Sequence, residues 1–128
     1  MILHLSDLSQ EPLHSQISRQ IRAKVLSGNL LEGTLLPSIR ALAREQRVSV
    51  ITVQRAYEDL DREGIIDSRR GKGFYVAALT DDRKLGISLG RLRENLKPVM
   101  QDALAAGMTR DRILRVIREM LETKEARR

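Results

Sequence analysis

Guanidinium, hydroxyl and amide side chains gather in three short stretches of this 128-residue chain. Arginine and lysine bind phosphate, arginine also pairs with guanine, and glutamine has the bidentate geometry for adenine. Serine and threonine hydroxyls bond phosphates or bases, and an exposed isoleucine contacts a thymine methyl group. The stretches contain Ser38 and Arg40, then Ser49, Ile51, Thr52, Gln54 and Arg55, and finally Arg69, Arg70, Gly71 and Lys72. Together they offer a surface for double-stranded DNA, provided that the fold brings them to one side.

Residues suited to catalysis or metal binding are scarce. The two histidines, His4 and His14, have no cluster of carboxylates beside them in the sequence, and cysteine is absent. No H-x-x-x-H spacing and no glycine-rich loop before a helix occurs, so neither a metal site nor a phosphate-binding cofactor site is expected. The sequence therefore predicts a protein that is not an enzyme and that needs no cofactor.

The overall composition favours a folded protein with a polyanionic partner. Lys and Arg number 23 against 17 Asp and Glu, a formal charge of +6, and hydrophobic residues make up 41% of the chain. The aromatic residues Tyr57, Phe74 and Tyr75 are too few for a platform that stacks single-stranded bases. The longest apolar run, residues 74–79, is far too short to span a membrane, and the N-terminus lacks the features of a signal peptide. With no cysteine, these features predict a cytoplasmic protein without a membrane partner.

Apolar residues at helical spacing predict three helices in the first half of the chain. They run from Pro12 to Gly28, from the N-cap Ser38 to about Arg47, and from the N-cap Ser49 to Gly64, with a loop over residues 28–37. The core-facing residues of the third helix are Val53, Ala56, Tyr57 and Leu60. Because successive residues advance by about 100°, Ile51 and Arg55 lie on the opposite face, with Thr52 and Gln54 on its flanks. This face is the predicted recognition surface.

Charges on the third helix limit how it can meet DNA. Phosphates repel the acidic cluster, which consists of Glu58, Asp59, Asp61 and Glu63. Only the N-terminal half of the helix is therefore expected to enter the groove, which is the usual docking of a recognition helix. Arg55 could instead pair with Glu58 or Asp59, which places it below Gln54 and Thr52 as a DNA contact.

After Gly64 the helical period gives way to a strand, a tight turn and a second strand. The strands cover residues 65–69 and 74–76, and the turn crowds Arg69, Arg70 and Lys72 around Gly71. Such a turn favours the DNA backbone or minor groove, although charge at an exposed hairpin also protects a sheet edge. The fold class is thus mainly α with a small β-hairpin, and residues 1–78 are predicted to form a winged helix-turn-helix domain.

Residues 79–128 have a different character, typical of a helical dimerisation tail. Four- and three-residue steps, the heptad spacing of a coiled-coil seam, separate Leu85, Leu89, Leu92, Leu96, Val99 and Ala103. Pro98 inside this run is expected to kink the helix or split it. After Gly107 and the N-cap Thr109, a second helix carries Ile113, Ile117 and Met120 on an apolar face. Two such helices predict a homodimer. The alternative is a monomer whose tail folds back on its own winged helix.

Four sequence blocks resemble the DNA-binding domain of the GntR family of bacterial transcription regulators. They are residues 12–17 (PLHSQI), 36–43 (LPSIRALA), 48–57 (VSVITVQRAY) and 71–76 (GKGFYV), with Gly64 before the last. The resemblance covers roughly residues 12–77, and the short two-helix tail is similar to that of the YtrA subfamily. It implies that Arg40, Arg70 and Gly71 contact DNA. It also implies repression of an operon for an ATP-binding-cassette transporter and of the protein's own gene.

The chain departs from this family at two places within the blocks. His14 stands where relatives frequently have an aromatic residue, which is expected to change packing around the first helix. Val50 stands where a basic residue is frequent, so base readout at this position is expected to differ. The tail is too short for the larger effector domains of the family, and this excludes a pyridoxal-phosphate role.

Two functions remain open at this point. The first is a sequence-specific transcription regulator that binds a palindromic operator as a homodimer. The second is a dimeric winged-helix adaptor or a nonspecific architectural DNA-binding protein, and comparison of specific with random duplexes separates the two. A small-molecule effector in the cleft between the winged domain and the tail is left open as well.

Overall fold

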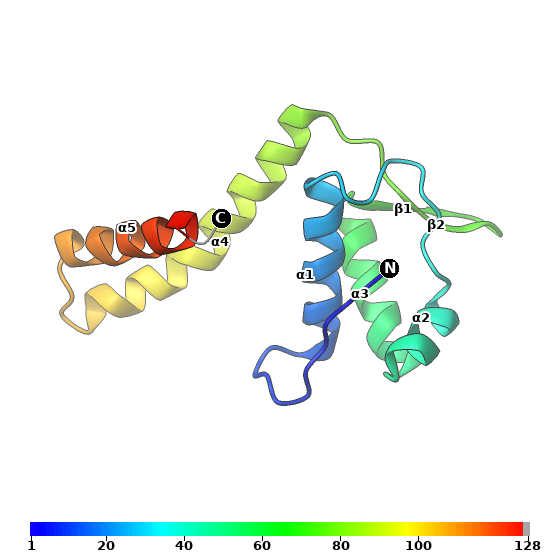
Figure 1. The fold of residues 1–128 in the computed structure, drawn as a ribbon, viewed down its shortest axis with the longest axis horizontal. Coiled ribbons are helices and arrows are strands. Elements are labelled where there is room, and N and C mark those ends of the chain that lie inside the picture. The colour runs from blue at the N-terminus through cyan, green and yellow to red at the C-terminus, as the bar shows by residue number, and fades with distance from the viewer. Residues whose placement is uncertain (127–128) are drawn as a thin grey trace. The chain divides into compact units, whose positions relative to one another are not determined.

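Five helices and two strands follow one another along the chain in a computed structural model that describes residues 1–126 (Figure 1). They are α1 (Leu13–Leu26), α2 (Ile39–Gln46), α3 (Val50–Arg62), β1 (Ile66–Arg69), β2 (Gly73–Val76), α4 (Asp81–Ala105) and α5 (Arg110–Ala126). The chain divides into one unit over Met1–Thr80 and a second that begins at Asp81. The predicted fold class, mainly helical with a small hairpin, is confirmed.

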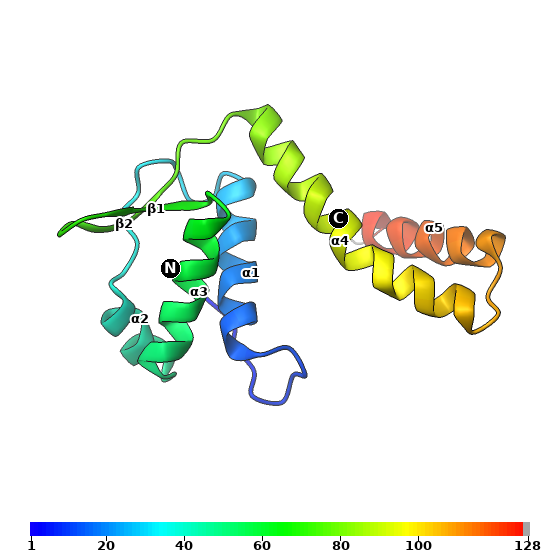
Figure 2. The ribbon, with the colours of Figure 1, turned by 180° about the vertical axis from the view of Figure 1, so that it is seen from behind.

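The core of the first unit forms where α3 packs against α1 and α2 (Figure 2). Its fully buried side chains include Ile17, Ile21, Val25, Leu42, Val53, Ala56, Tyr57, Leu60, Ile65 and Ile66. The apolar faces predicted for the three helices are therefore the faces that are buried. The polar faces of α2 and α3 remain available to solvent or to a ligand.

Side-chain caps begin both helices of the helix-turn-helix, as predicted. The hydroxyl of Ser38 accepts the Ala41 N–H at 3.1 Å, and that of Ser49 accepts the Thr52 N–H at 3.1 Å. Each bond satisfies an N–H group that the first helical turn leaves without a partner. Helix α2 ends at Gln46, and the backbone of its C-cap, Arg47, adopts the left-handed conformation with φ 56° and ψ 44°.

The wing contains a third strand-like segment that the apolar pattern does not reveal. Strands β1 and β2 pair antiparallel, and Gly71 occupies the turn with φ 73°. On the other edge of β2, the Gly33 and Leu36 N–H groups donate to Val76 and Phe74 at 2.8 and 2.9 Å. The predicted loop over residues 28–37 contains no helix or strand of its own, but its residues 33–36 pair with β2.

Two glutamine side chains hold the N-terminal segment against α1. The Gln20 amide exchanges hydrogen bonds with the backbone N–H and C=O of His4 at 2.8 and 2.7 Å. Gln16, which is buried, does the same with Ser6 at 2.9 Å for both bonds. Leu3 is buried beside them. Residues 1–12 therefore belong to the packed first unit.

The second unit consists of α4 and α5, which contact each other. Helix α4 continues through Pro98, so the expected split does not occur. Gly107 follows α4 with φ 97°, and the Thr109 hydroxyl accepts the Arg112 N–H at 3.1 Å, as its predicted capping role requires. None of the described helices is long and apolar enough to cross a membrane.

Candidate nucleic-acid interface

The exposed face of α3 carries the residues that the helical period predicts. Val53, Ala56, Tyr57 and Leu60 turn into the core. Ile51 is 75% exposed, Gln54 and Arg55 are exposed, and Thr52 is half-buried. The N-terminal half of α3 therefore presents one apolar, one hydroxyl, one amide and one guanidinium group within five residues, which suits readout of base edges.

Hydrogen bonds on α3 engage the polar side chains that the sequence ranks above Arg55 as DNA contacts. The Gln54 amide donates to the Glu58 carboxylate at 3.1 Å, and the Ser49 and Thr52 hydroxyls bond each other at 2.7 Å. The ion pair considered for Arg55 does not form, and Arg55 has no partner among the described residues. Arg55 is thus the polar group of this face that requires no rearrangement to contact DNA.

Tyr57 ties the start of α2 to α3. Its side chain is fully buried, and its hydroxyl donates to the Pro37 carbonyl at 2.8 Å. Burial, assisted by the charge of Glu45, raises the pKa of Tyr57 far above its ordinary value, so the hydroxyl stays a donor. This bond fixes the backbone immediately before Ser38 and Arg40, both of which are exposed.

The wing is attached to the same tyrosine. Phe74 of β2 meets Tyr57 edge to face, with ring centroids 5.0 Å apart and planes inclined by 72°. On the other face of the hairpin, the Arg69 guanidinium lies 4.2 Å from the centre of the Tyr75 ring. The tip residues Arg69, Arg70, Gly71 and Lys72 are all exposed. Tyr57 therefore joins α2, α3 and the wing in one rigid arrangement.

Tyr57→Phe is expected to destabilise the fold by about 1–2 kcal/mol, because the half-buried Pro37 carbonyl loses its donor. DNA affinity is expected to fall as well, since the start of α2 loses its link to α3. Urea unfolding and anisotropy titration measure the two effects. Tyr75→Phe is the matched control, because the Tyr75 hydroxyl has no hydrogen-bond partner in residues 1–126. Equal stability of both variants would show that the Tyr57 bond is dispensable.

The acidic cluster at the C-terminal half of α3 is largely engaged within the fold. Asp59 accepts a bond from Arg62 and lies 3.9 Å from Nδ1 of His14, which is buried without a hydrogen-bond partner. Glu63 accepts two bonds from Arg22. These carboxylates hold the first unit together, and their charge still disfavours phosphates at this end of α3. No group of three metal-ligating side chains occurs within the part of the chain that the structure describes.

Two further exposed arginines, Arg44 and Arg47, lie on and directly after α2. The sequence pattern did not single them out, because neither belongs to a capping or turn signal. The four-residue spacing from Arg40 to Arg44 is the signal that places these two on one helix face, and Arg47 follows as the C-cap.

Comparison with known proteins confirms the resemblance. The family model described as "Bacterial regulatory proteins, gntR family" matches residues 13–76. The chain belongs to the GntR family. The chain is 31% identical over 119 residues to the HTH-type transcriptional repressor YtrA of Bacillus subtilis (strain 168), covering 93% of this chain and 92% of that protein. An uncharacterised regulator of the same organism, YhcF, is 32% identical over 117 residues, 89% of this chain and 93% of that protein.

Solved structures support the same assignment over nearly the whole chain. A structure titled transcriptional antiterminator from Listeria monocytogenes EGD-e has a TM-score of 0.74 at 31% identity and covers 94% of this chain and 90% of that one. YtrA from Sulfolobus acidocaldarius, described as a GntR-family transcription factor, has a TM-score of 0.63 at 30% identity and covers 82% and 99%. The relatives of this GntR protein are transcription regulators and not enzymes, which confirms the prediction that it is no enzyme.

Proposed function

We propose that this GntR protein is a sequence-specific repressor that binds a palindromic operator as a homodimer. The observation that carries the proposal is the exposed N-terminal half of α3, with Ile51, Gln54 and Arg55, together with an exposed basic wing tip, on a scaffold joined by Tyr57. A related domain, AraR(DBD), has been solved in complex with operator ORX1, with a TM-score of 0.52, 28% identity and coverage of 60% of this chain and 95% of that one. The regulated genes we propose are a transporter operon and the protein's own gene.

In this proposal each group of side chains has its own target. Arg40, Ile51, Gln54 and Arg55 contact base edges, while Ser38, Ser49 and Thr52 contact phosphates through hydroxyls. At the wing tip, Arg69, Arg70 and Lys72 bind the backbone or minor groove, and Gly71 allows its close approach. Residues 1–78 then act as the DNA-binding domain.

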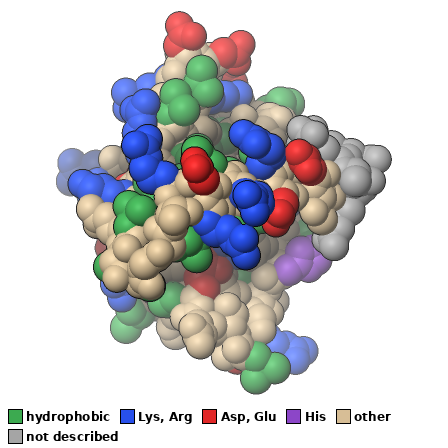
Figure 3. All heavy atoms as spheres, turned by 90° about the vertical axis from the view of Figure 1, so that its left-hand side faces the viewer, with side chains coloured by type: hydrophobic (Ala, Val, Ile, Leu, Met, Phe, Trp, Pro, Cys, Tyr) green, Lys and Arg blue, Asp and Glu red, His purple; other side chains and the backbone are tan. Residues whose placement is uncertain are grey.

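We assign dimerisation to residues 79–128, whose apolar seam is uncovered in the single chain. No residue of α4 is buried, and Leu85, Leu92 and Val99 are 59%, 59% and 63% exposed. The other seam residues on α4 are Leu89, Leu96 and Ala103, and α5 contributes Ile113, Ile117 and Met120. Hydrophobic side chains accordingly lie at the molecular surface among charged ones (Figure 3). A second copy of the tail is the cover that a two-fold dimer supplies.

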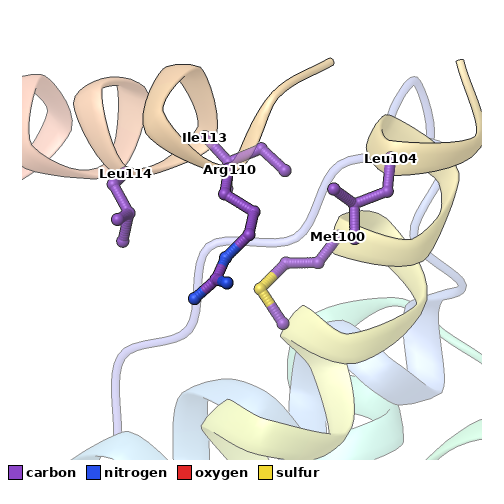
Figure 4. A pocket seen from close by; sticks show the side chains of 5 residues that line it. All are labelled: Met100, Leu104, Arg110, Ile113 and Leu114. Atoms are coloured by element: carbon purple, nitrogen blue, oxygen red, sulfur yellow. The ribbon is translucent and has the colours of Figure 1, made fainter. Parts of the chain in front are cut away.

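A hollow between α4 and α5 is consistent with the assignment of dimerisation to the tail. It has a volume of about 280 Å³ and is lined by Met100, Leu104, Arg110, Ile113 and Leu114. Figure 4 shows the Arg110 and Met100 side chains extending into it from the two helices. Binding of a small-molecule effector stays a prediction, because the residues of this hollow do not test it.

Because a repressor acts on chromosomal DNA, we propose a cytoplasmic location.

Fluorescence anisotropy with the duplex upstream of the protein's own gene, beside a scrambled duplex and over a salt series, tests the function. A preference of roughly a thousandfold with a log–log salt slope of several units is expected. Equal binding to both duplexes would support the nonspecific architectural alternative. No binding to either at low salt would support the adaptor.

Arg40→Ala is expected to weaken operator binding by about 1–3 kcal/mol and to relax the preference at one base position. The first turn of a helix disfavours a cation, and guanine or phosphate compensates this charge. Arg19→Ala is the matched control, because Arg19 is an exposed arginine that already donates three hydrogen bonds to Glu11. An unchanged dissociation constant for Arg40→Ala at fixed salt would remove this residue from the interface.

A further inference from the structure

Helix α2 and its C-cap carry a row of three arginines. Arg40 and Arg44 are four residues apart on one side of α2, opposite the buried Leu42, and Arg47 directly follows the helix as its C-cap. All three are exposed, and none has a hydrogen bond or ion pair from its side chain within residues 1–126. Three like charges at this spacing repel one another in the free protein.

The backbone conformation of Arg47 does not require an arginine side chain. Arg47 is the one residue other than glycine with a positive φ in the described part of the chain, at φ 56° and ψ 44°. Its N–H donates to the Ala43 and Arg44 carbonyls, which ends α2, and glycine does this without crowding by a side chain. The fold therefore needs a left-handed residue here and gains nothing from the guanidinium.

The position of Arg47 places its charge beside the recognition surface. Arg47 precedes Ser49, the cap of α3, by two residues, so their Cα atoms are at most about 7 Å apart. Measured along the helix axis, the row from Arg40 to Arg47 spans about 10 Å. This matches the rise of about three nucleotides of one DNA strand.

We propose that Arg47, together with Arg44, binds backbone phosphates next to the groove that α3 enters. The DNA interface then extends along α2, and a single strand's phosphates neutralise Arg44 and Arg47. This inference rests on the proposed DNA-binding function and adds two residues to it.

Arg47→Gly separates a binding role from a structural one, because the two predict opposite effects. Glycine relieves the left-handed backbone, so the thermal midpoint of unfolding is expected to stay the same or rise by up to about 4 °C. Affinity is expected to fall about three- to tenfold on operator and scrambled duplex alike. The log–log salt slope is expected to become shallower by about 1 per protomer. Arg44→Ala should lower affinity and slope in the same way.

Two further variants control for backbone effects at the turn. Arg47→Lys keeps the positive charge and is expected to retain most of the salt slope. Arg47→Asn removes the charge but tolerates the left-handed conformation, so it should bind as Arg47→Gly does. Wild-type affinity and slope in Arg47→Gly and Arg47→Asn would overturn the inference. A loss confined to the operator would replace the phosphate contact with a base contact and overturn it too. Failure of the wild-type protein to bind either duplex would instead refute the proposed function.

Discussion

Replacing Leu92 with glutamate is expected to convert the proposed dimer into monomers and to lower operator affinity at least about a hundredfold. Leu92 lies in the middle of the apolar seam of α4 and is 59% exposed in the single chain. In a two-fold dimer the change removes two buried leucine side chains and places two unpaired carboxylates at the interface. A monomer holds one half-site and loses the avidity of the second, which is worth about 10²–10⁴ in affinity.

Sedimentation equilibrium and anisotropy on the same samples measure both parts of this prediction. Gln101→Glu is the matched control, because Gln101 is exposed on α4 and lies across the helix from the seam. This variant should remain dimeric and bind normally. A dimeric Leu92→Glu protein with wild-type affinity would show that α4 does not form the interface and would favour the fold-back alternative.

The second large effect is expected at Arg22, where Arg22→Met should cost about 3 kcal/mol of unfolding free energy. The Arg22 guanidinium donates from Nε and Nη2 to the two Glu63 oxygens at 3.0 and 2.7 Å, which joins α1 to the end of α3. Its side chain is only 7% exposed, and that of Glu63 is 24% exposed. Removing the arginine leaves a carboxylate that water solvates incompletely, which costs more than the pair contributes.

The N-terminal half of α1 contains a control, Arg19, which has the same chemistry as Arg22 but is more exposed. Arg19 pairs with Glu11 through Nε and Nη2 as well, yet its side chain is 57% exposed. Arg19→Met is therefore expected to cost less than about 1 kcal/mol. Urea unfolding at one protein concentration compares the variants. The double variant Arg22→Met with Glu63→Leu should recover most of the loss, and an equal cost for Arg19→Met and Arg22→Met would contradict the argument from burial.

Local patterns in the sequence were sufficient for the helices and for the face that α3 presents. Ser38, Ser49 and Thr109 are caps because a hydroxyl before a helix can reach an N–H within the next three residues, which is a local rule. The core positions of α1 and α3 follow from helical period alone. Such patterns do not predict the functional role of each side chain on the exposed face of α3, since that role depends on what the side chain contacts.

The features that escaped prediction depend on residues far apart in the sequence. The bond from Tyr57 to Pro37, the clamp of Gln16 on Ser6, and the pairing of residues 33–36 with β2 join segments that no periodicity relates. Pairing of Arg55 with Glu58 or Asp59 was an alternative to DNA contact, but Gln54 donates to Glu58 instead. Gln54 and Arg55 are neighbouring donors near Glu58 in the sequence, and only Gln54 bonds its carboxylate.

The paired segment before α2 bears on how this protein can change length over evolution. Residues 27–32 connect α1 to that segment and form no pairs with the wing, so insertions or deletions there leave the register intact. Residues 33–36 differ, because a single inserted residue would turn Leu35 and its neighbours to the opposite face of the wing. One connection thus contains a stretch that tolerates length variation and a stretch that does not, and homologous sequences should show gaps in the first and none in the second.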